Sequence, residues 1–212
     1  QPQSADEPIM SSGKLYSAAH TRANRHHWAL EELGVPYELV NLDLSQAQHK
    51  TPEYLKVHPL GVVPALSDGD LTMFESVAIC MYLADKYADK KLAPPLDSPL
   101  RGRYYQWMLF FASTLEPVVG TLFLHTVRLP PEQRIPALAE AARAQLAPLL
   151  KIIEATLSQH DYLLGSEFCM ADVIMGTGLM WAKSLGWLSE HPVLLAYVAR
   201  LSQRPALHRT RQ

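Results

Sequence analysis

Residues 58–76 read HPLGVVPALSDGDLTMFES, and this stretch decides how the first half of the chain folds. An Asp-Gly-Asp tripeptide at 68–70 separates two short apolar runs, 65–67 and 71–74, which is a strong signal for an antiparallel β-hairpin. The Ser that closes the stretch opens a helix over residues 76–87, whose apolar positions form a broad stripe. We therefore expect two paired strands followed by a helix.

The residues before this stretch alternate between strand and helix patterns. Residues 14–17 and 37–42 have the character of short strands, and residues 22–33 between them carry apolar side chains at helical spacing. Gly34 ends that helix, and Thr51 caps a further short one. The resulting order, βαβαββα, predicts a compact α+β domain of about 80 residues with a mixed sheet.

A proline-rich connection divides the chain. The segment LAPPLDSP at 92–99 would be tolerated neither in a helix nor in a central strand. The periodic segments downstream are all typical of helices, at 100–127, 137–157, 172–185 and 193–201. We place the domains at 11–90 and 99–212, with residues 91–98 as the linker, and expect the second domain to be an all-α helical bundle.

The composition bounds the classes of function. The chain has 212 residues, of which 48% are hydrophobic and 19% are charged, as in an ordinary globular protein. A formal net charge of −2 supplies no basic field for nucleic acid. No apolar run reaches the roughly 18 residues of a membrane-spanning helix, and the opening QPQSADEPIM lacks the pattern of a secretory signal. We expect a cytoplasmic protein that binds neither nucleic acid nor membrane.

The cysteines and histidines do not point to redox or metal chemistry. Cys80 and Cys169 are far apart in apolar contexts, which favours buried free thiols over a disulfide or a redox pair, and no CxxC motif occurs. No histidine has the spacing to Cys, Asp or Glu that zinc sites use. The adjacent His26 and His27 would point about 100° apart on a helix. We expect no metal site.

Val63-Pro64 and Glu75-Ser76 each have two interpretations. A trans turn is the commoner state of any X-Pro bond, but a cis bond would turn the amide and carbonyl of Val63 outward, free to pair with an extended peptide. Glu75 and Ser76 stand at a predicted helix N-terminus. They can simply cap the helix. Alternatively, Ser76 can bind a carboxylate through its hydroxyl and amide, while Glu75 accepts a hydrogen bond from an ammonium group.

The loop after the first strand, residues 17–25, contains a candidate for activating a thiol. A hydroxyl at a helix N-terminus can hydrogen-bond a thiolate and stabilise it, and the helix dipole acts in the same direction. Lowering a thiol pKa by about two units from roughly 8.5 requires about 2.7 kcal/mol. One hydrogen bond to a charged group supplies about 1.5–3 kcal/mol. Thr21 is the natural candidate, and its alternative role as a helix cap is compatible with this one.

In this order and spacing, the motifs resemble those of glutathione S-transferases from about Gly13 onward. Four stretches carry the resemblance: TRANRHHWALEELGVPYELV, TPEYLKVHPLGVVPAL, FESVAICMYLADKY and DYLLGSEFCMADV. It implies a thioredoxin-like domain followed by an all-α domain, which agrees with the boundary that the composition indicates. It also implies a homodimer, with each active site near the cleft between subunits.

The resemblance implies specific partners for glutathione, the co-substrate of this family. Val63 would pair with its cysteinyl backbone beside a cis Pro64, and Glu75 and Ser76 would hold its γ-glutamyl end. The glycine carboxylate would lie near three neighbouring side chains ahead of the second helix: Gln48, His49 and Lys50.

The resemblance also implies where the thiol is activated. Thr21 matches the hydroxyl of the serine-type classes and Tyr16 the catalytic residue of the tyrosine-type classes, and Ser17 is a third candidate. The cysteine of the beta class would fall on Arg22, which excludes that chemistry. We expect a transferase that conjugates glutathione to hydrophobic electrophiles in detoxification. The alternatives are a non-catalytic ligand-binding or interaction module, and a glutathione-dependent peroxidase or reductase.

The aromatic stripe at 104–111 has two interpretations as well. Its residues fit the core of a helical bundle. The resemblance instead implies an electrophile pocket near four of them: Tyr104, Tyr105, Met108 and Phe111.

Overall fold

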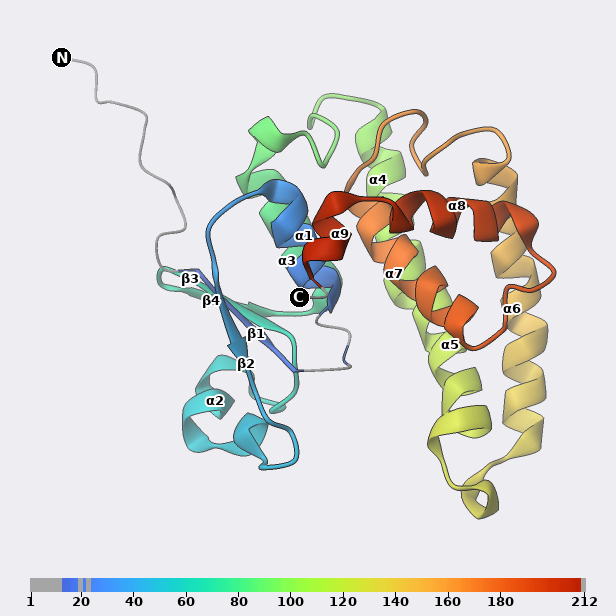
Figure 1. Ribbon diagram of the computed structural model, residues 1–212, viewed down its shortest axis with the longest axis horizontal. Helices are drawn as coiled ribbons and strands as arrows, with labels where there is room; N and C mark the ends of the chain where they lie inside the picture. The colour runs from blue at the N-terminus through green and yellow to red at the C-terminus, as the bar shows by residue number, and fades with distance from the viewer. Residues whose placement is uncertain (1–12, 19–20, 22–23, 211–212) are drawn as a thin grey trace. The chain divides into compact units, whose positions relative to one another are not determined.

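The structure is a computed structural model, and it describes residues 13–18, 21 and 24–210 of the chain. Within this part the chain forms two compact units, whose elements are labelled in Figure 1. The first unit contains the described residues up to Lys90 together with those from Pro205 onward, and the second is Lys91–Arg204. The first unit mixes strands and helices, and the second is helical.

The sheet of the first unit has the strand order β2-β1-β3-β4. Its strands are β1 (Lys14–Ser17), β2 (Glu38–Asn41), β3 (Ala65–Asp68) and β4 (Leu71–Phe74). β1 pairs in parallel with β2 and antiparallel with β3, and β3 and β4 form the predicted hairpin. Gly69 in its turn has a φ of 59°, a conformation that glycine adopts without a steric penalty. The predicted α+β class is confirmed.

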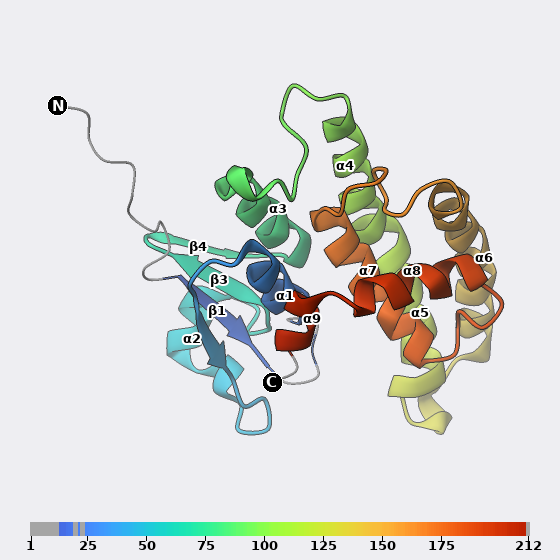
Figure 2. The same ribbon diagram turned by 45° about the horizontal axis from the view of Figure 1, so that its top comes forward.

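The helices of the first unit complete the predicted order: α1 (Asn24–Leu33), α2 (Pro52–Val57) and α3 (Ser76–Lys86). α1 and α3 pack side by side (Figure 1 and Figure 2). Trp28 and Ile79 on these helices are fully buried, as are Leu15 and Leu66 on the strands. Burying each such side chain contributes about 1.5–3 kcal/mol. Two short 3₁₀ turns were not predicted, Gln48–Lys50 and Ala88–Lys90, since three residues give no periodic pattern.

The second unit begins with one long helical run, Leu100–Arg128. Its parts are α4 (Leu100–Leu109), a π-helical segment (Phe110–Leu115), α5 (Glu116–Phe123) and a second π-helical segment (Leu124–Arg128). A 3₁₀ turn (Pro131–Gln133) leads to the remaining helices: α6 (Pro136–Leu157), α7 (Met170–Ser184) and α8 (Pro192–Ser202). α5 packs against α6, and α4 and α8 pack against α7. The predicted all-α second half is confirmed.

The run Leu100–Arg128 is long and apolar enough to cross a membrane, with a mean hydropathy of 1.5 over an 18-residue window. The prediction that no apolar run reaches this length was wrong. Within residues 107–124, Glu116 is the one charged residue, and the few other polar residues are uncharged, so the run remains apolar on average. Core helices of globular proteins meet the same criterion. Met108 and Leu122 of the run are fully buried, so it supplies core to the second unit.

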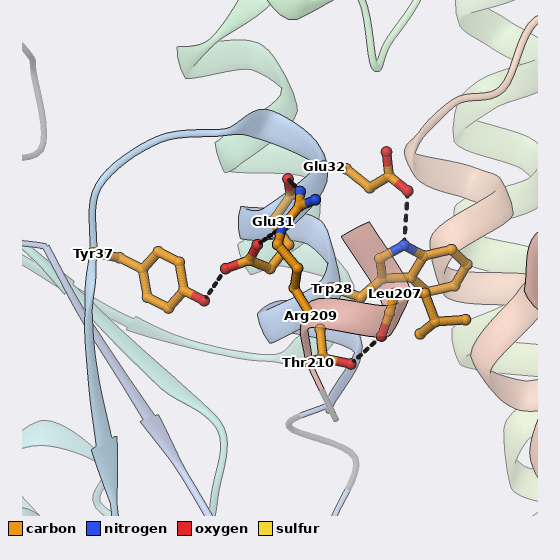
Figure 3. A network of polar contacts seen from close by, with 7 residues as sticks. All are labelled: Trp28, Glu31, Glu32, Tyr37, Leu207, Arg209 and Thr210. Atoms are coloured by element: carbon orange, nitrogen blue, oxygen red, sulfur yellow. Dashed lines mark hydrogen bonds and ion pairs between the residues drawn. The ribbon is translucent and has the colours of Figure 1, made fainter. Parts of the chain in front are cut away.

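The last helix, α9 (Pro205–Arg209), belongs to the first unit, where it packs on α1. Figure 3 shows the polar network that accompanies this packing. Arg209 pairs with the Glu31 carboxylate and donates to the Glu31 carbonyl at 3.0 Å, while the Tyr37 hydroxyl donates to the same carboxylate at 2.7 Å. The predicted helical domain ran to residue 212. The structure differs because the contacts that place α9 join residues 178 positions apart, which leave no local pattern.

Candidate functional site

The backbone at Val63 lies where an extended peptide could pair with it. The Val63–Pro64 peptide bond is cis, the less common of the two states that the sequence left open. Val63 is partly exposed, whereas Pro64 and Ala65, where β3 begins, are buried. The chain therefore passes from an accessible position into the core within two residues.

Side chains around this loop hold its backbone. Lys50 donates from Nζ to the Leu60 carbonyl at 2.9 Å, and Tyr54 donates from its hydroxyl to the Val62 carbonyl at 2.7 Å. The Leu60 amide donates to Nδ1 of the His58 ring at 3.3 Å. Three bonds thus fix the loop without help from a ligand.

Gly61 occupies a place in this loop that a larger residue cannot take. Its φ of 56° lies in the left-handed region. A Cβ atom here would lie 2.5 Å from the His49 carbonyl oxygen and 2.9 Å from the side chain of Lys50. The loop can therefore lie directly against the Gln48–Lys50 turn only because position 61 is glycine.

Glu75 and Ser76 form the second part of the site, at the N-terminus of α3. Glu75 is exposed and has a φ of 77°, an uncommon backbone state that costs a residue with a side chain about 1–3 kcal/mol. The buried His26 ring of α1 donates from Nε2 to the Ser76 carbonyl at 2.9 Å. Because a carbonyl oxygen only accepts, that nitrogen must carry the hydrogen. His26 therefore ties the start of α3 to α1.

A stacked pair of rings connects the two parts of the site. The rings of His58 and Phe74 are stacked, with centroids 4.5 Å apart and planes at 26°. Burial lowers the pKa of His58, and the nearby Glu75 carboxylate opposes that shift. A neutral His58 ring is the form in which Nδ1 can accept the hydrogen bond from the loop.

The three hydroxyl candidates have different surroundings. Thr21 donates its hydroxyl proton to the Ala18 carbonyl at 2.7 Å, so in this conformation its oxygen can accept a hydrogen bond but cannot donate one. Ser17 is buried. Tyr16 is partly exposed, and its ring lies at a tilt to that of Tyr54, with centroids 5.5 Å apart. Arg22, where a catalytic cysteine was excluded, is outside the described residues.

The three candidates for a carboxylate contact are not equivalent. Gln48 uses its side-chain oxygen to accept from the Asp43 amide at 2.8 Å, and Lys50 already holds the Leu60 carbonyl. The Nδ1 atom of His49 is buried and has no hydrogen-bond partner among the residues that the structure describes. His49 therefore has a buried ring nitrogen that the described part of the fold does not use, and Gln48 keeps its side-chain NH₂.

Three of the four residues assigned to an electrophile pocket are buried. Tyr104 and Met108 have no exposed surface and Phe111 is 2% exposed, whereas Tyr105 is 36% exposed. The Phe111 ring lies on the backbone of α7, since a Cβ atom at Gly178 would be 2.3 Å from it. Tyr105 is the member of this group that presents surface.

A cavity that the sequence did not predict lies beside the first loop, with a volume of about 540 Å³. Its lining comes from the ends of β1 and β2 and the loop after β2: Ala18, Asn41, Leu42, Asp43, Leu44 and Ser45. Because β1 and β2 are parallel, their carboxyl ends meet at one edge of the sheet. The strand-helix-strand order was the signal in the sequence, because such a unit joins parallel strands. The cavity at this edge lies next to the hydroxyl candidates.

The two cysteines lie in the cores of the two units. Cys80 and Cys169 are free and buried, as predicted. Burial raises the pKa of Cys80 to about 12, so its thiol is not a nucleophile. Within the described ranges, no group of three His, Cys, Asp or Glu side chains could hold a metal ion.

Comparison with known proteins gives consistent results. The family model for the glutathione S-transferase N-terminal domain matches residues 11–85, and that for the C-terminal domain matches residues 136–200. Glutathione S-transferase F10 of Arabidopsis thaliana is 34% identical over 165 residues, which cover 75% of each chain. The glutathione transferase URE2P6 of Phanerochaete chrysosporium, solved with oxidized glutathione, is 30% identical, with a TM-score of 0.84 over 93% of this chain and 94% of that one. A theta class glutathione S-transferase of Xanthomonas axonopodis pv. citri, solved with glutathione bound, is 34% identical, with a TM-score of 0.79 over 95% and 97% of the two chains.

Proposed function

Because this chain belongs to the glutathione S-transferase family, we propose that glutathione binds between the Val63 backbone and the Glu75–Ser76 turn. The chain is a glutathione transferase, and glutathione is its co-substrate. The cysteinyl backbone pairs with Val63 beside Pro64 in this proposal. Ser76 binds the γ-glutamyl carboxylate through its hydroxyl and amide, and Glu75 accepts from the ammonium group.

The observation that carries this proposal is the fixed backbone on both sides of the site. The loop up to Val62 is held by three side-chain bonds, and the start of α3 is held by His26. A site that is already arranged loses less conformational entropy when a flexible tripeptide binds. The strained backbone of Glu75 also supports a binding site here, since strained residues cluster at functional sites.

For the glycine carboxylate, we assign His49 as the main contact. Lys50 adds positive charge nearby, although its ammonium group is shared with the Leu60 carbonyl. Gln48 can contribute its side-chain amide NH₂, because only its oxygen is used within the fold.

For thiol activation, we propose a hydroxyl in the first loop, with Thr21 as the leading residue and Tyr16 and Ser17 as the alternatives. To stabilise a thiolate, Thr21 must turn its proton from the Ala18 carbonyl to the sulfur. That exchange replaces a neutral acceptor by a charged one, which gives the stronger hydrogen bond. Activation then follows from lowering the thiol pKa and holding the reactants together, without a covalent intermediate on the protein.

For the acceptor, we propose a hydrophobic electrophile bound at the cavity beside Ala18. Leu42 and Leu44 line that cavity and supply apolar surface. In the second unit, Tyr105 is the exposed member of the group formed with Tyr104, Met108 and Phe111, so it is the one that can contact a small molecule without repacking the core of that unit. Detoxification of such electrophiles is the role that fits this chemistry.

We further propose that the chain forms a homodimer and works in the cytoplasm. Glutathione S-transferases often form dimers, and they use small-molecule substrates. The long helical run carries exposed apolar side chains that a second copy would cover, among them Leu109 and Val127. The two free cysteines are compatible with a reducing compartment.

Retention on immobilised glutathione, with elution by free glutathione, tests the proposed site. We expect the wild-type chain to be retained, and we expect Glu75→Gln to elute earlier because it loses the charge that accepts from the ammonium group. Equal elution of the two proteins would contradict the placement of the γ-glutamyl end. Failure of the wild type to bind would favour the non-catalytic module, although no comparison favours that alternative.

A further inference from the structure

Tyr54 makes a contact whose effect reaches the proposed glutathione site. Its side chain on α2 is 4% exposed, and its hydroxyl donates to the Val62 carbonyl at 2.7 Å. Burial raises the pKa of Tyr54 to about 12, and the neighbouring Tyr16 adds to that shift. The hydroxyl therefore keeps its proton and remains a donor at neutral pH.

The bond fixes the direction of the next amide group. The peptide unit between Val62 and Val63 is trans, because Val63–Pro64 is the one cis peptide bond among the described residues. In a planar trans peptide, the carbonyl of one residue and the N–H of the next point in opposite directions. With the Val62 carbonyl held by Tyr54, the Val63 N–H must point away from Tyr54.

Within the part of the chain that the structure describes, no other side-chain bond acts on this peptide unit in the same way. Lys50 and His58 hold Leu60, two residues earlier, and Gly61 follows with its left-handed backbone. Val62 itself is exposed, so its side chain does not anchor the unit. Among the side-chain hydrogen bonds of the described loop, the one from the Tyr54 hydroxyl reaches the carbonyl next to Val63.

We propose that Tyr54 is a positioning residue for glutathione, which aims the Val63 amide at the cysteinyl backbone through its bond to the Val62 carbonyl. This inference rests on the proposed function, because Val63 must be the residue that pairs with glutathione. Tyr54 itself touches neither the ligand nor the sulfur in this scheme. Its hydroxyl alters affinity for the peptide backbone of the ligand and leaves the chemistry of the thiol unchanged.

Tyr54→Phe is the variant that isolates this effect. It removes the hydroxyl and keeps the ring that lies against Tyr16. The matched control is Tyr37→Phe, which removes another hydroxyl bond of 2.7 Å in the same unit, to Glu31 in the network of Figure 3. Binding is measured calorimetrically with glutathione and with γ-glutamyl-2-aminobutyryl-glycine, an analogue with the same backbone and no sulfur. Thermal unfolding of each variant is recorded in parallel.

We expect Tyr54→Phe to weaken binding of both ligands equally, by about three- to tenfold, which is the usual effect of losing one such hydrogen bond. Tyr37→Phe should lower the unfolding temperature without changing either affinity. Unchanged binding of both ligands by Tyr54→Phe would overturn the inference. Weaker binding of glutathione but not of the sulfur-free analogue would overturn it too, and would place the effect at the sulfur through Tyr16. Equal losses in both variants would overturn it too, by showing general destabilisation. If the wild type binds neither ligand, both this inference and the proposed function fail. The other adverse outcomes contradict only the inference about Tyr54.

Discussion

A single methyl group added at Gly178 should disturb the packing of the Phe111 ring and lower the stability of the protein. In Gly178→Ala the new Cβ atom would lie 2.3 Å from Cε2 and 2.9 Å from Cζ of the Phe111 ring. Phe111 is 2% exposed, so its ring cannot swing into solvent to make room. Overpacking of this kind costs about 1–3 kcal/mol. Replacing glycine by alanine inside a helix returns about 1 kcal/mol.

The net change for Gly178→Ala is therefore a loss of about 0–2 kcal/mol of unfolding free energy. Gly102→Ala is the matched control, because Gly102 is also helical, in α4, and a Cβ atom there would meet nothing within 4 Å. It should gain up to about 1 kcal/mol. The difference between the two variants isolates the cost of the overlap, about 1–3 kcal/mol.

Urea unfolding followed by far-ultraviolet circular dichroism measures this difference, provided that the variants share one m-value. If Gly178→Ala proves as stable as Gly102→Ala, the Phe111 ring is free to move, and the core assignment of Phe111 is wrong. That outcome would return Phe111 to the electrophile pocket with which the sequence associated it. The same experiment therefore decides between the two interpretations of the aromatic stripe.

Three other predictions follow from the site and the terminal network. Thr21→Ala should raise the pKa of the bound glutathione thiol by about two units, read from thiolate absorbance against pH, and an unchanged titration would move the role to Tyr16 or Ser17. His26→Leu should weaken glutathione binding about fivefold, because it removes the bond to the Ser76 carbonyl. His26→Gln keeps an N–H donor and should restore much of the affinity. Equal affinity of the wild type and His26→Leu would show that this bond to α3 does not affect binding. Burial alone would raise the pKa of Glu31, but hydrogen bonds from its partners outweigh burial and lower that pKa below its usual 4.5. The contribution of the ionised Glu31 to the free energy of unfolding is then complete above about pH 4.5 and is lost as the pH falls further. The stability difference between wild type and Glu31→Gln should therefore shrink on acidification. A difference that stays constant with pH would contradict this account.

The sequence predicted the elements that depend on local signals. The Asp-Gly turn predicted the hairpin correctly, and the proline-rich segment at 92–99 separated the mixed unit from the helical one. Both features act on the backbone of the residues that carry them, so a sequence window contains the whole cause.

The parts that the sequence did not predict depend on contacts between distant residues. The His26 bond to the Ser76 carbonyl joins residues 50 positions apart, and in the sequence His26 was only one of several histidines weighed as metal ligands. Thr21 was identified as a hydroxyl donor, yet its proton is directed to a carbonyl three residues earlier, a choice that depends on the exact loop path. Residue type indicates what a side chain can do, and tertiary packing decides whether it is free to do so.

The position of α9 has a consequence for how the protein is made. Its residues are translated after the whole helical unit, yet they pack on α1, near the beginning of the chain. On the ribosome the first unit can form its sheet and its α1–α3 layer early, because domains tend to fold in order of synthesis. It must nevertheless wait for the last helix to cover α1, so this surface stays open on the nascent chain while the intervening 114 residues, Lys91–Arg204, are still being synthesised.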